Sequence, residues 1–170
     1  MPTTRPIPSL PLAAAVLTGT VALLMALVAF GNITDFGTNQ AFVQHVLAMD
    51  TTFKDPDLMW RAVESPTLQN IAYVLIIVWE TLAALVLVAA TALWARELRR
   101  GAGYAGGRRL STIGLLMVLS LFGAGFMAIG GEWFAMWQSK SWNGLEAATR
   151  NFVPAGVALV VVQLRGPDER

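Results

Sequence analysis

The chain has 170 residues, of which 55% are hydrophobic and 14% are charged. A soluble domain carries about 25% charged residues, so this shortage indicates a chain that is partly solvated by lipid. The net charge of +1 and the scattered positions of its twelve Lys and Arg exclude a basic surface for nucleic acid. The absence of cysteine excludes disulfides, thiolate metal sites, iron–sulfur clusters and cysteine nucleophiles.

Four stretches are long and apolar enough to cross a bilayer, which needs roughly 20 apolar residues per helix. The first apolar run exceeds the core of a signal peptide, so we expect it to be retained. The second stretch contains one charge, Glu80, and the fourth begins among headgroups. The chain is therefore predicted to be an all-α membrane protein, a single four-transmembrane-helix bundle (1–170), with spans at about 11–30, 71–95, 110–131 and 145–164.

The basic residues are distributed unevenly between the two ends of the predicted bundle. Five arginines lie in the loop 96–109 and three more in the termini, against four Lys and Arg on the opposite side. Because Lys and Arg are enriched on the cytoplasmic side of membranes, we expect this loop and both termini to be cytoplasmic. The remaining loops, 31–70 and 132–144, are then outer loops.

The first outer loop, 31–70, is longer than a simple connection between two helices requires. An amphipathic helix is predicted within it, because apolar residues recur at helical spacing, at Phe42, Val46 and Met49. This helix is expected on the bilayer surface or over the mouth of the bundle. A second short helix is expected around 58–63.

The second outer loop, 132–144, has an interfacial aromatic segment, formed by Trp133, Phe134, Trp137 and Trp142. Tryptophan is enriched at membrane–water interfaces, so these rings are expected to anchor the protein there. The alternative is an apolar lid or a surface for a partner, beside Gly130 and Gly131.

Several segments together resemble one protein family. They are Gly31-Asn32 with Thr34-Asp35, FVQHVLAMDTT at 42–52, Trp60-Arg61-Ala62, and GGEWFAMWQSKSWNG at 130–144. They are similar to the bacterial small predicted integral membrane proteins of domain of unknown function 2165, over nearly the whole chain. The resemblance implies a four-span protein of the bacterial inner (plasma) membrane. It implies no activity and assigns no catalytic residue.

Glu80 is the ionisable residue deepest within a predicted span, ten residues from its start. A carboxylate at such a depth costs about 2.5–3.5 kcal/mol on insertion scales, so Glu80 should face the bundle interior and have a partner. We expect a mainly protonated side chain that donates a hydrogen bond across the bundle. Its expected partner is Ser120, Thr112 or a tryptophan indole on a neighbouring helix. The functional alternative is a proton or substrate site.

Glu132 and Arg61 complete a candidate intramembrane polar site with Glu80. Glu132 follows two glycines, which permits a cavity, but a salt bridge with Arg61 or Arg150 is the interpretation that we favour. His45 is the only histidine, and it is expected to be solvated or paired with an aspartate. A lone histidine is a poor basis for zinc or haem, so no metal or cofactor is predicted.

The first span carries a stripe of small residues, formed by Ala15, Gly19, Ala22, Ala26 and Ala29. Small residues allow helices to approach closely in lipid. We expect this stripe to pack within the chain rather than to form a dimer.

Two classes of function remain. We favour a non-catalytic membrane subunit, scaffold or assembly factor that contacts the bilayer and a membrane protein partner or a second copy. The alternative is a small-ligand or proton-linked binder or transporter that uses Glu80 and the Glu132 region. Enzymatic activity is disfavoured, because the chain has no nucleophile elbow and no zinc protease motif.

Overall fold

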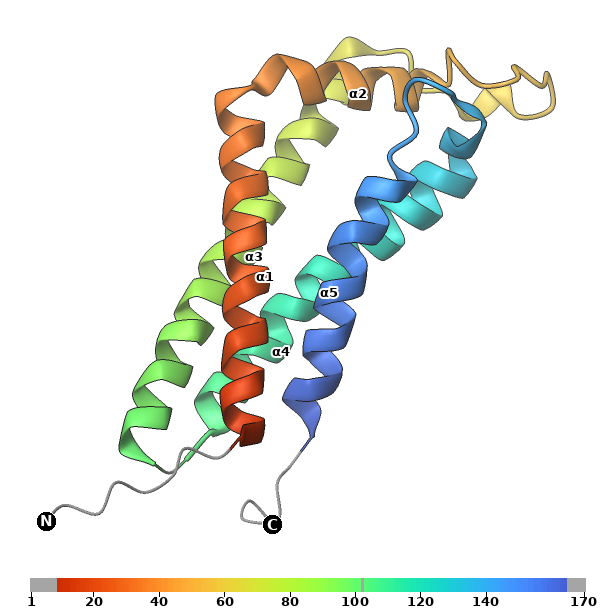
Figure 1. Ribbon diagram of the computed structural model, residues 1–170. Helices are drawn as coiled ribbons and strands as arrows, with labels where there is room; N and C mark the ends of the chain where they lie inside the picture. The colour runs from red at the N-terminus through yellow and green to blue at the C-terminus, as the bar shows by residue number, and fades with distance from the viewer. Residues whose placement is uncertain (1–8, 102, 165–170) are drawn as a thin grey trace, which may run out of the picture.

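The computed structural model describes residues 9–101 and 103–164. Four helical rods run side by side as a bundle (Figure 1), and each is long and apolar enough to cross a membrane. The rods are α1 (Ser9–Thr34), α3 (Pro66–Arg100), α4 (Ala105–Leu119) continued by η2 (Ser120–Trp133), and α5 (Leu145–Gln163). The described residues contain no strand. The prediction of an all-α bundle of four membrane helices is confirmed.

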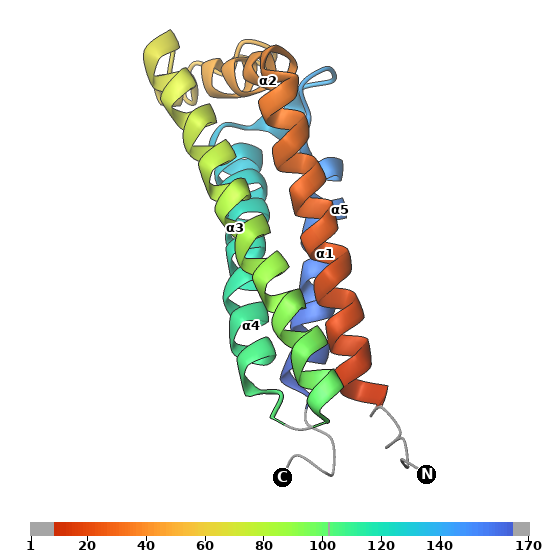
Figure 2. The ribbon, with the colours of Figure 1, turned by 90° about the vertical axis from the view of Figure 1, so that its left-hand side faces the viewer.

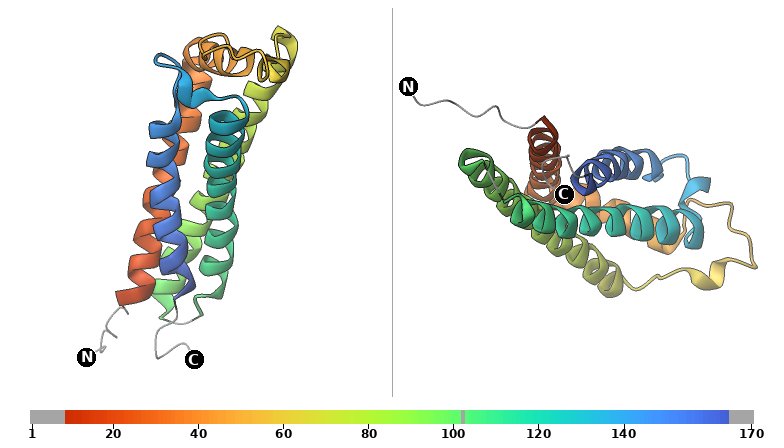
Figure 3. Two further views of the ribbon diagram at one scale, coloured as in Figure 1. Left: turned by 90° about the vertical axis from the view of Figure 1, so that its right-hand side faces the viewer. Right: turned by 90° about the horizontal axis from the view of Figure 1, so that it is seen from below.

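Three shorter elements gather at one end of the bundle. They are α2 (Phe36–Ala48), η1 (Met59–Arg61) and η3 (Met136–Gln138). We call this the cap end, and we call the end with the connection from α3 to α4 the Arg-rich end. Figures 1 and 2 show α2 lying across the cap end, so the predicted amphipathic helix covers the mouth of the bundle. The second predicted short helix is a single 3₁₀ turn. Helix α1 begins and α5 ends at the Arg-rich end (Figure 3).

Helices α1 and α3 extend beyond the apolar runs from which they were predicted. Helix α3 begins at Pro66, because Ser65 supplies an N-cap whose side chain accepts a hydrogen bond from the Leu68 N–H. Proline suits the first helical turn, where its missing N–H is not needed. Helix α1 continues past residue 30 to Thr34. The extension carries Asn32 into the helical bundle, where it becomes part of the site described below.

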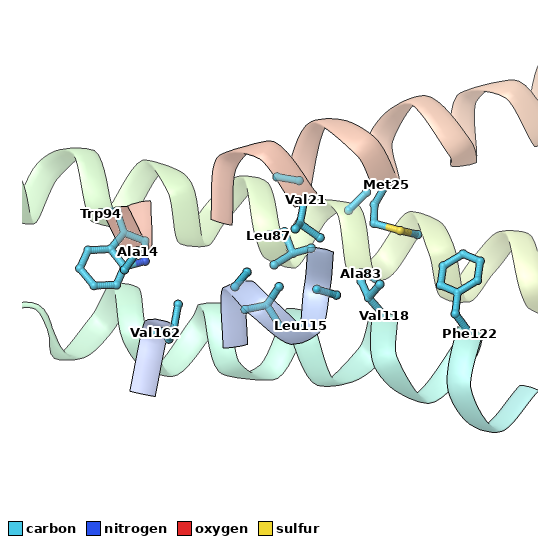
Figure 4. Close-up of a cluster of buried hydrophobic side chains, with 14 of the residues drawn as sticks. Ala14, Val21, Met25, Ala83, Leu87, Trp94, Leu115, Val118, Phe122 and Val162 are labelled. Atoms are coloured by element: carbon cyan, nitrogen blue, oxygen red, sulfur yellow. The ribbon is translucent and has the colours of Figure 1, made fainter. Parts of the chain in front are cut away.

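The core runs along the bundle axis, from Trp94 near the Arg-rich end to Phe122 nearer the cap end (Figure 4). One polar cluster is buried within it. The Ser111 hydroxyl oxygen accepts hydrogen bonds from the Thr18 hydroxyl at 3.1 Å and from the Trp94 indole N–H at 2.9 Å. These bonds satisfy polar groups that lipid could not satisfy, and they join α1, α3 and α4.

The stripe of small residues on α1 packs within the chain. Ala22 and Ala29 are buried, and a Cβ added at Gly19 would lie 3.3 Å from the Thr91 side chain of α3. Close approach of these two helices therefore depends on the small side chains of the stripe, as expected for helices in lipid.

The continuation of α4 is a π-helix, in which backbone hydrogen bonds span five residues instead of four. It is 14 residues long, and it ends with the bond from the Phe134 N–H to the Ile129 carbonyl at 3.0 Å. Most π-helices are single turns, and they are frequent at functional sites. Four glycines, 123, 125, 130 and 131, lie in this segment. The third span was predicted as one rod, and its change of helix type was not predicted.

Candidate functional site

An apolar cavity of about 320 Å³ lies beneath α2, between α3 and η2. Its walls come from four parts of the chain and consist almost wholly of apolar atoms. They are Phe42, Val43, Val46 and Leu47 of α2; Ala72, Leu75 and Ile76 of α3; Leu121, Gly125, Phe126, Ile129 and Gly130 of η2; and Phe134 and Met136. The cavity is thus roofed by the cap and walled by two membrane helices.

The walls that α3 and η2 give to the cavity reach the outside of the bundle. Two of its wall residues, Leu75 and Ile129, are 62% and 53% exposed on the outside of the bundle. Gly125 contributes no side chain, and a Cβ added there would meet only Leu121, at 3.6 Å. Because both helices are long and apolar enough to be membrane spans, these exposed wall residues are positioned for contact with lipid.

Hydrogen bonds between side chains hold the roof in place. The Gln40 and Gln44 side chains of α2 donate to the Asn70 amide oxygen of α3, at 2.8 Å and 3.3 Å. The Asn39 side chain of α2 donates to the Asn32 amide oxygen of α1 at 2.7 Å. The apolar face of α2 therefore covers the cavity, while its polar face bonds to α1 and α3.

The same chain of bonds reaches Glu80. Asn32 Nδ2 donates to Glu80 Oε2 at 2.6 Å, and the Tyr73 hydroxyl donates to the Asn32 backbone carbonyl at 3.2 Å. Glu80 is buried, as predicted, and it follows the cavity-lining Ile76 by about one turn of α3. The chain Asn39–Asn32–Glu80 thus joins three helices.

The partner of Glu80 differs from the prediction. Thr112 donates to the Arg108 carbonyl, and Ser120 and the Trp79 indole both donate to the Met117 carbonyl. Glu80 Oε2 also accepts a hydrogen bond, where a donor was expected. The reason is the length of α1, which continues far enough to place an amide donor opposite Glu80.

Arg61 packs against aromatic rings. Its guanidinium carbon lies 4.7 Å from the Trp133 ring centroid and 5.6 Å from that of Trp60. Its Nη1 donates to the Trp133 carbonyl at 3.4 Å. Within residues 9–101 and 103–164 neither Arg61 nor Arg150 has a carboxylate within 4 Å, so the salt bridge expected for Glu132 is not formed. Glu132 itself is exposed.

Glu80, Glu132 and Arg61 do not converge on one another. No hydrogen bond or ion pair of the described residues joins Glu80 to either of the other two. Glu80 lies between α1 and α3, whereas Arg61 and Glu132 lie at the cap end.

The four aromatic rings of the second loop lie in different environments. Trp133 and Trp137 are exposed, Phe134 is buried in the cavity wall, and Trp142 stacks on His45 with ring centroids 4.4 Å apart. His45 Nδ1 also lies 2.6 Å from Asp50 Oδ2. The predicted pairing of the histidine with an aspartate is therefore observed.

The two loops of the cap are bonded to each other. The hydroxyl oxygens of Thr51 and Ser139 lie 2.8 Å apart, and the Phe53 backbone N–H donates to Gln138 Oε1 at 2.9 Å. The Val63 N–H also donates to the Leu47 carbonyl at 2.8 Å, which binds the segment before α3 to α2. The roof of the cavity is thus one connected structure.

Comparison with known proteins assigns the chain to a family. The family described as predicted small integral membrane protein (DUF2165) matches residues 10–165. The chain belongs to this family. The DUF2165 match covers all four membrane helices and both cap loops, so it confirms the resemblance found in the sequence. No curated protein and no solved structure matches the chain.

Two elements of the site in this DUF2165 protein were not predicted from its sequence. The first was Asn32 as the partner of Glu80, because the first span was predicted to end at residue 30. Asn32 nevertheless lies in one of the segments that resemble the family. The second was the cavity. Its only indication in the sequence is the pair Gly123 and Gly125, two glycines close together inside a predicted span.

Proposed function

We propose that the protein is a non-catalytic, membrane-embedded binder of a small apolar molecule or chain, which enters the cavity sideways from the bilayer. The observation that carries this proposal is the apolar cavity of about 320 Å³ beneath α2. Ligand pockets have volumes of about 300–1,000 Å³ and mostly apolar walls, and they are common between the helices of bundles. The proposal corresponds to the second of the two function classes that the sequence left open.

The physical basis of binding is packing. Lipid tails are as apolar as leucine, so the hydrophobic effect does not drive a chain from the bilayer into the cavity. An unfilled cavity, however, leaves its wall atoms without dispersion partners, and a chain of matching shape restores those contacts. Phe42, Phe126 and Phe134 provide the large wall surfaces. Selectivity should therefore depend on the width and bending of the chain.

Filling the cavity tests this function. Gly125→Leu should reduce co-purification of lipid with the protein at least about tenfold, because the added side chain extends into space that has no backbone in contact with it. Lipids retained after purification in mild detergent would be counted by native mass spectrometry. Ala124→Leu adds the same side chain to the neighbouring, exposed position and should leave the count unchanged. An equal count for Gly125→Leu and the unmodified protein would contradict the proposal.

A second candidate function, a scaffold for a protein partner, is supported by exposed rings on the cap. Phe53 and Trp60 are 72% and 70% exposed. Rings at this level also suit an interfacial anchor. Purification in mild detergent separates the two candidates, since a stoichiometric protein partner supports the scaffold and a lone protein with bound lipid supports the binder.

We further propose that the Arg-rich end and both termini lie in the cytoplasm of a cell whose inner membrane holds the protein. The supporting observation is the excess of arginine at that end. Alkaline phosphatase fused after Asp57 should be active, and a fusion after Gly103 should be inactive. The opposite pair of activities would reverse the orientation.

A further inference from the structure

Arg61 lies at the cap end, where the segment leading into α3 meets the end of η2. Its Nη1 donates to the carbonyl of Trp133, and Trp133 directly precedes the cavity-wall residue Phe134. Its neighbours Ala62 and Val63 pack against the cluster that contains Phe134. The guanidinium is therefore held against the end of η2, one of the two membrane helices that wall the cavity.

The guanidinium has hydrogen-bonding capacity left over. Within the described part of the chain, its Nε has no hydrogen-bond acceptor, and no carboxylate lies within 4 Å. The rings of Trp60 and Trp133 flank it. An arginine offers five N–H donors in a rigid fork that matches phosphate and carboxylate oxygens. Indole rings beside it are characteristic of the membrane–water interface.

We propose that Arg61 and the cavity together form one site for an anionic amphiphile of the bilayer. The apolar chain occupies the cavity, and the phosphate of the headgroup binds the Arg61 guanidinium. This inference rests on the proposed function, because it requires that the cavity hold a chain. The order of the two parts along the bundle fits a lipid, with the cation at the cap end and the apolar walls within the spans.

The charge of the site distinguishes the ligand class. A cation at a membrane surface favours an anionic headgroup by an amount that corresponds to about a fivefold difference in affinity. A zwitterionic lipid with the same acyl chains should still fill the cavity, but without this preference. A free phosphate ion shares the headgroup chemistry and has no chain.

The experiment compares phosphatidylglycerol and phosphatidylcholine with identical acyl chains, added to the purified protein in micelles of a non-ionic detergent. Bound lipid is counted by native mass spectrometry. We expect the unmodified protein to prefer phosphatidylglycerol about fivefold. Arg61→Gln should lose this preference and still bind phosphatidylcholine. Arg150→Gln, which removes an exposed cation from the same end, should keep the preference.

The outcomes separate the inference from the proposed function. A preference that survives in Arg61→Gln overturns the inference alone, whereas binding of both lipids that survives in Gly125→Leu overturns the proposed function. If inorganic phosphate raises the unfolding temperature through Arg61 and abolishes the preference, the site binds free anions and the inference fails. If Arg61→Gln does not fold, the salt dependence of the unmodified protein decides. The preference should fall in high salt, and a constant preference contradicts the inference.

Discussion

Glu80→Leu is expected to destabilise the protein in detergent by about 1–3 kcal/mol, because it leaves the Asn32 amide without its acceptor in the bundle interior. Glu80→Gln should be tolerated, since its amide oxygen can accept the same hydrogen bond and its shape is nearly that of glutamate. The free energy of unfolding would be measured by titration with a denaturing detergent, with helical content as the signal.

A double-mutant cycle with Asn32→Leu tests whether the loss arises from this bond. Removing both partners should destabilise the protein by less than the sum of the two single changes. Val78→Ala, on an exposed position of the same helix, should have a small effect. If Glu80→Leu were tolerated as well as Glu80→Gln, the hydrogen bond from Asn32 would be unimportant for stability.

Gly114→Ala is expected to lower the free energy of unfolding by about 1–3 kcal/mol, through overpacking of α3 against α4. A Cβ at this position would lie 2.7 Å from two side-chain carbons of Leu87 and 3.2 Å from Val86. Leu87 is fully buried, so it cannot turn aside without displacing the core around it. The same detergent titration would measure the change.

Two other glycines provide a graded comparison. A Cβ added at Gly19 would lie 3.3 Å from the Thr91 side chain, a longer distance than the 2.7 Å at Gly114. Gly19→Ala should therefore be less destabilising than Gly114→Ala. A Cβ added at Gly31 would have no neighbouring atom within 4 Å. Gly31→Ala should therefore stabilise the protein by about 0.5–1 kcal/mol, because alanine has the better helix propensity. If the three substitutions change the free energy of unfolding equally, the distance from the added Cβ to the neighbouring helix does not determine their effect.

The four membrane helices were predictable because a bilayer imposes a length and an apolar composition that can be counted along the chain. The ends of these helices were less predictable. Ser65 and Pro66 start α3 before its apolar run begins, and α1 continues to Thr34 although the residues after Phe30 are partly polar. Polar residues remain helical there because the cap supplies partners for them.

The candidate site was only partly predictable for the same reason. The burial of Glu80 could be inferred from its cost in lipid, but its partner Asn32 is 48 residues away. The cavity depends on α2 lying across α3 and η2, and an amphipathic pattern indicates an apolar face without indicating what it covers. The salt bridge predicted for Glu132 was wrong because Arg61 is engaged by Trp133, through both its ring and its carbonyl.

The bonds between the two loops of the cap have a consequence for how the protein is made. Gln138 Oε1 accepts from the Phe53 N–H, 85 residues earlier in the chain, and Ser139 pairs with Thr51 across 88 residues. At synthesis rates of about 5–20 residues per second, Phe53 leaves the ribosome roughly 4–17 s before its partner. During that interval the first loop lacks both of these partners, and the side-chain hydrogen bonds available to α2 are those to α1 and α3. Assembly of the cavity roof therefore has to wait for the second loop, and we expect it to be completed only after the chain has been made as far as Ser139.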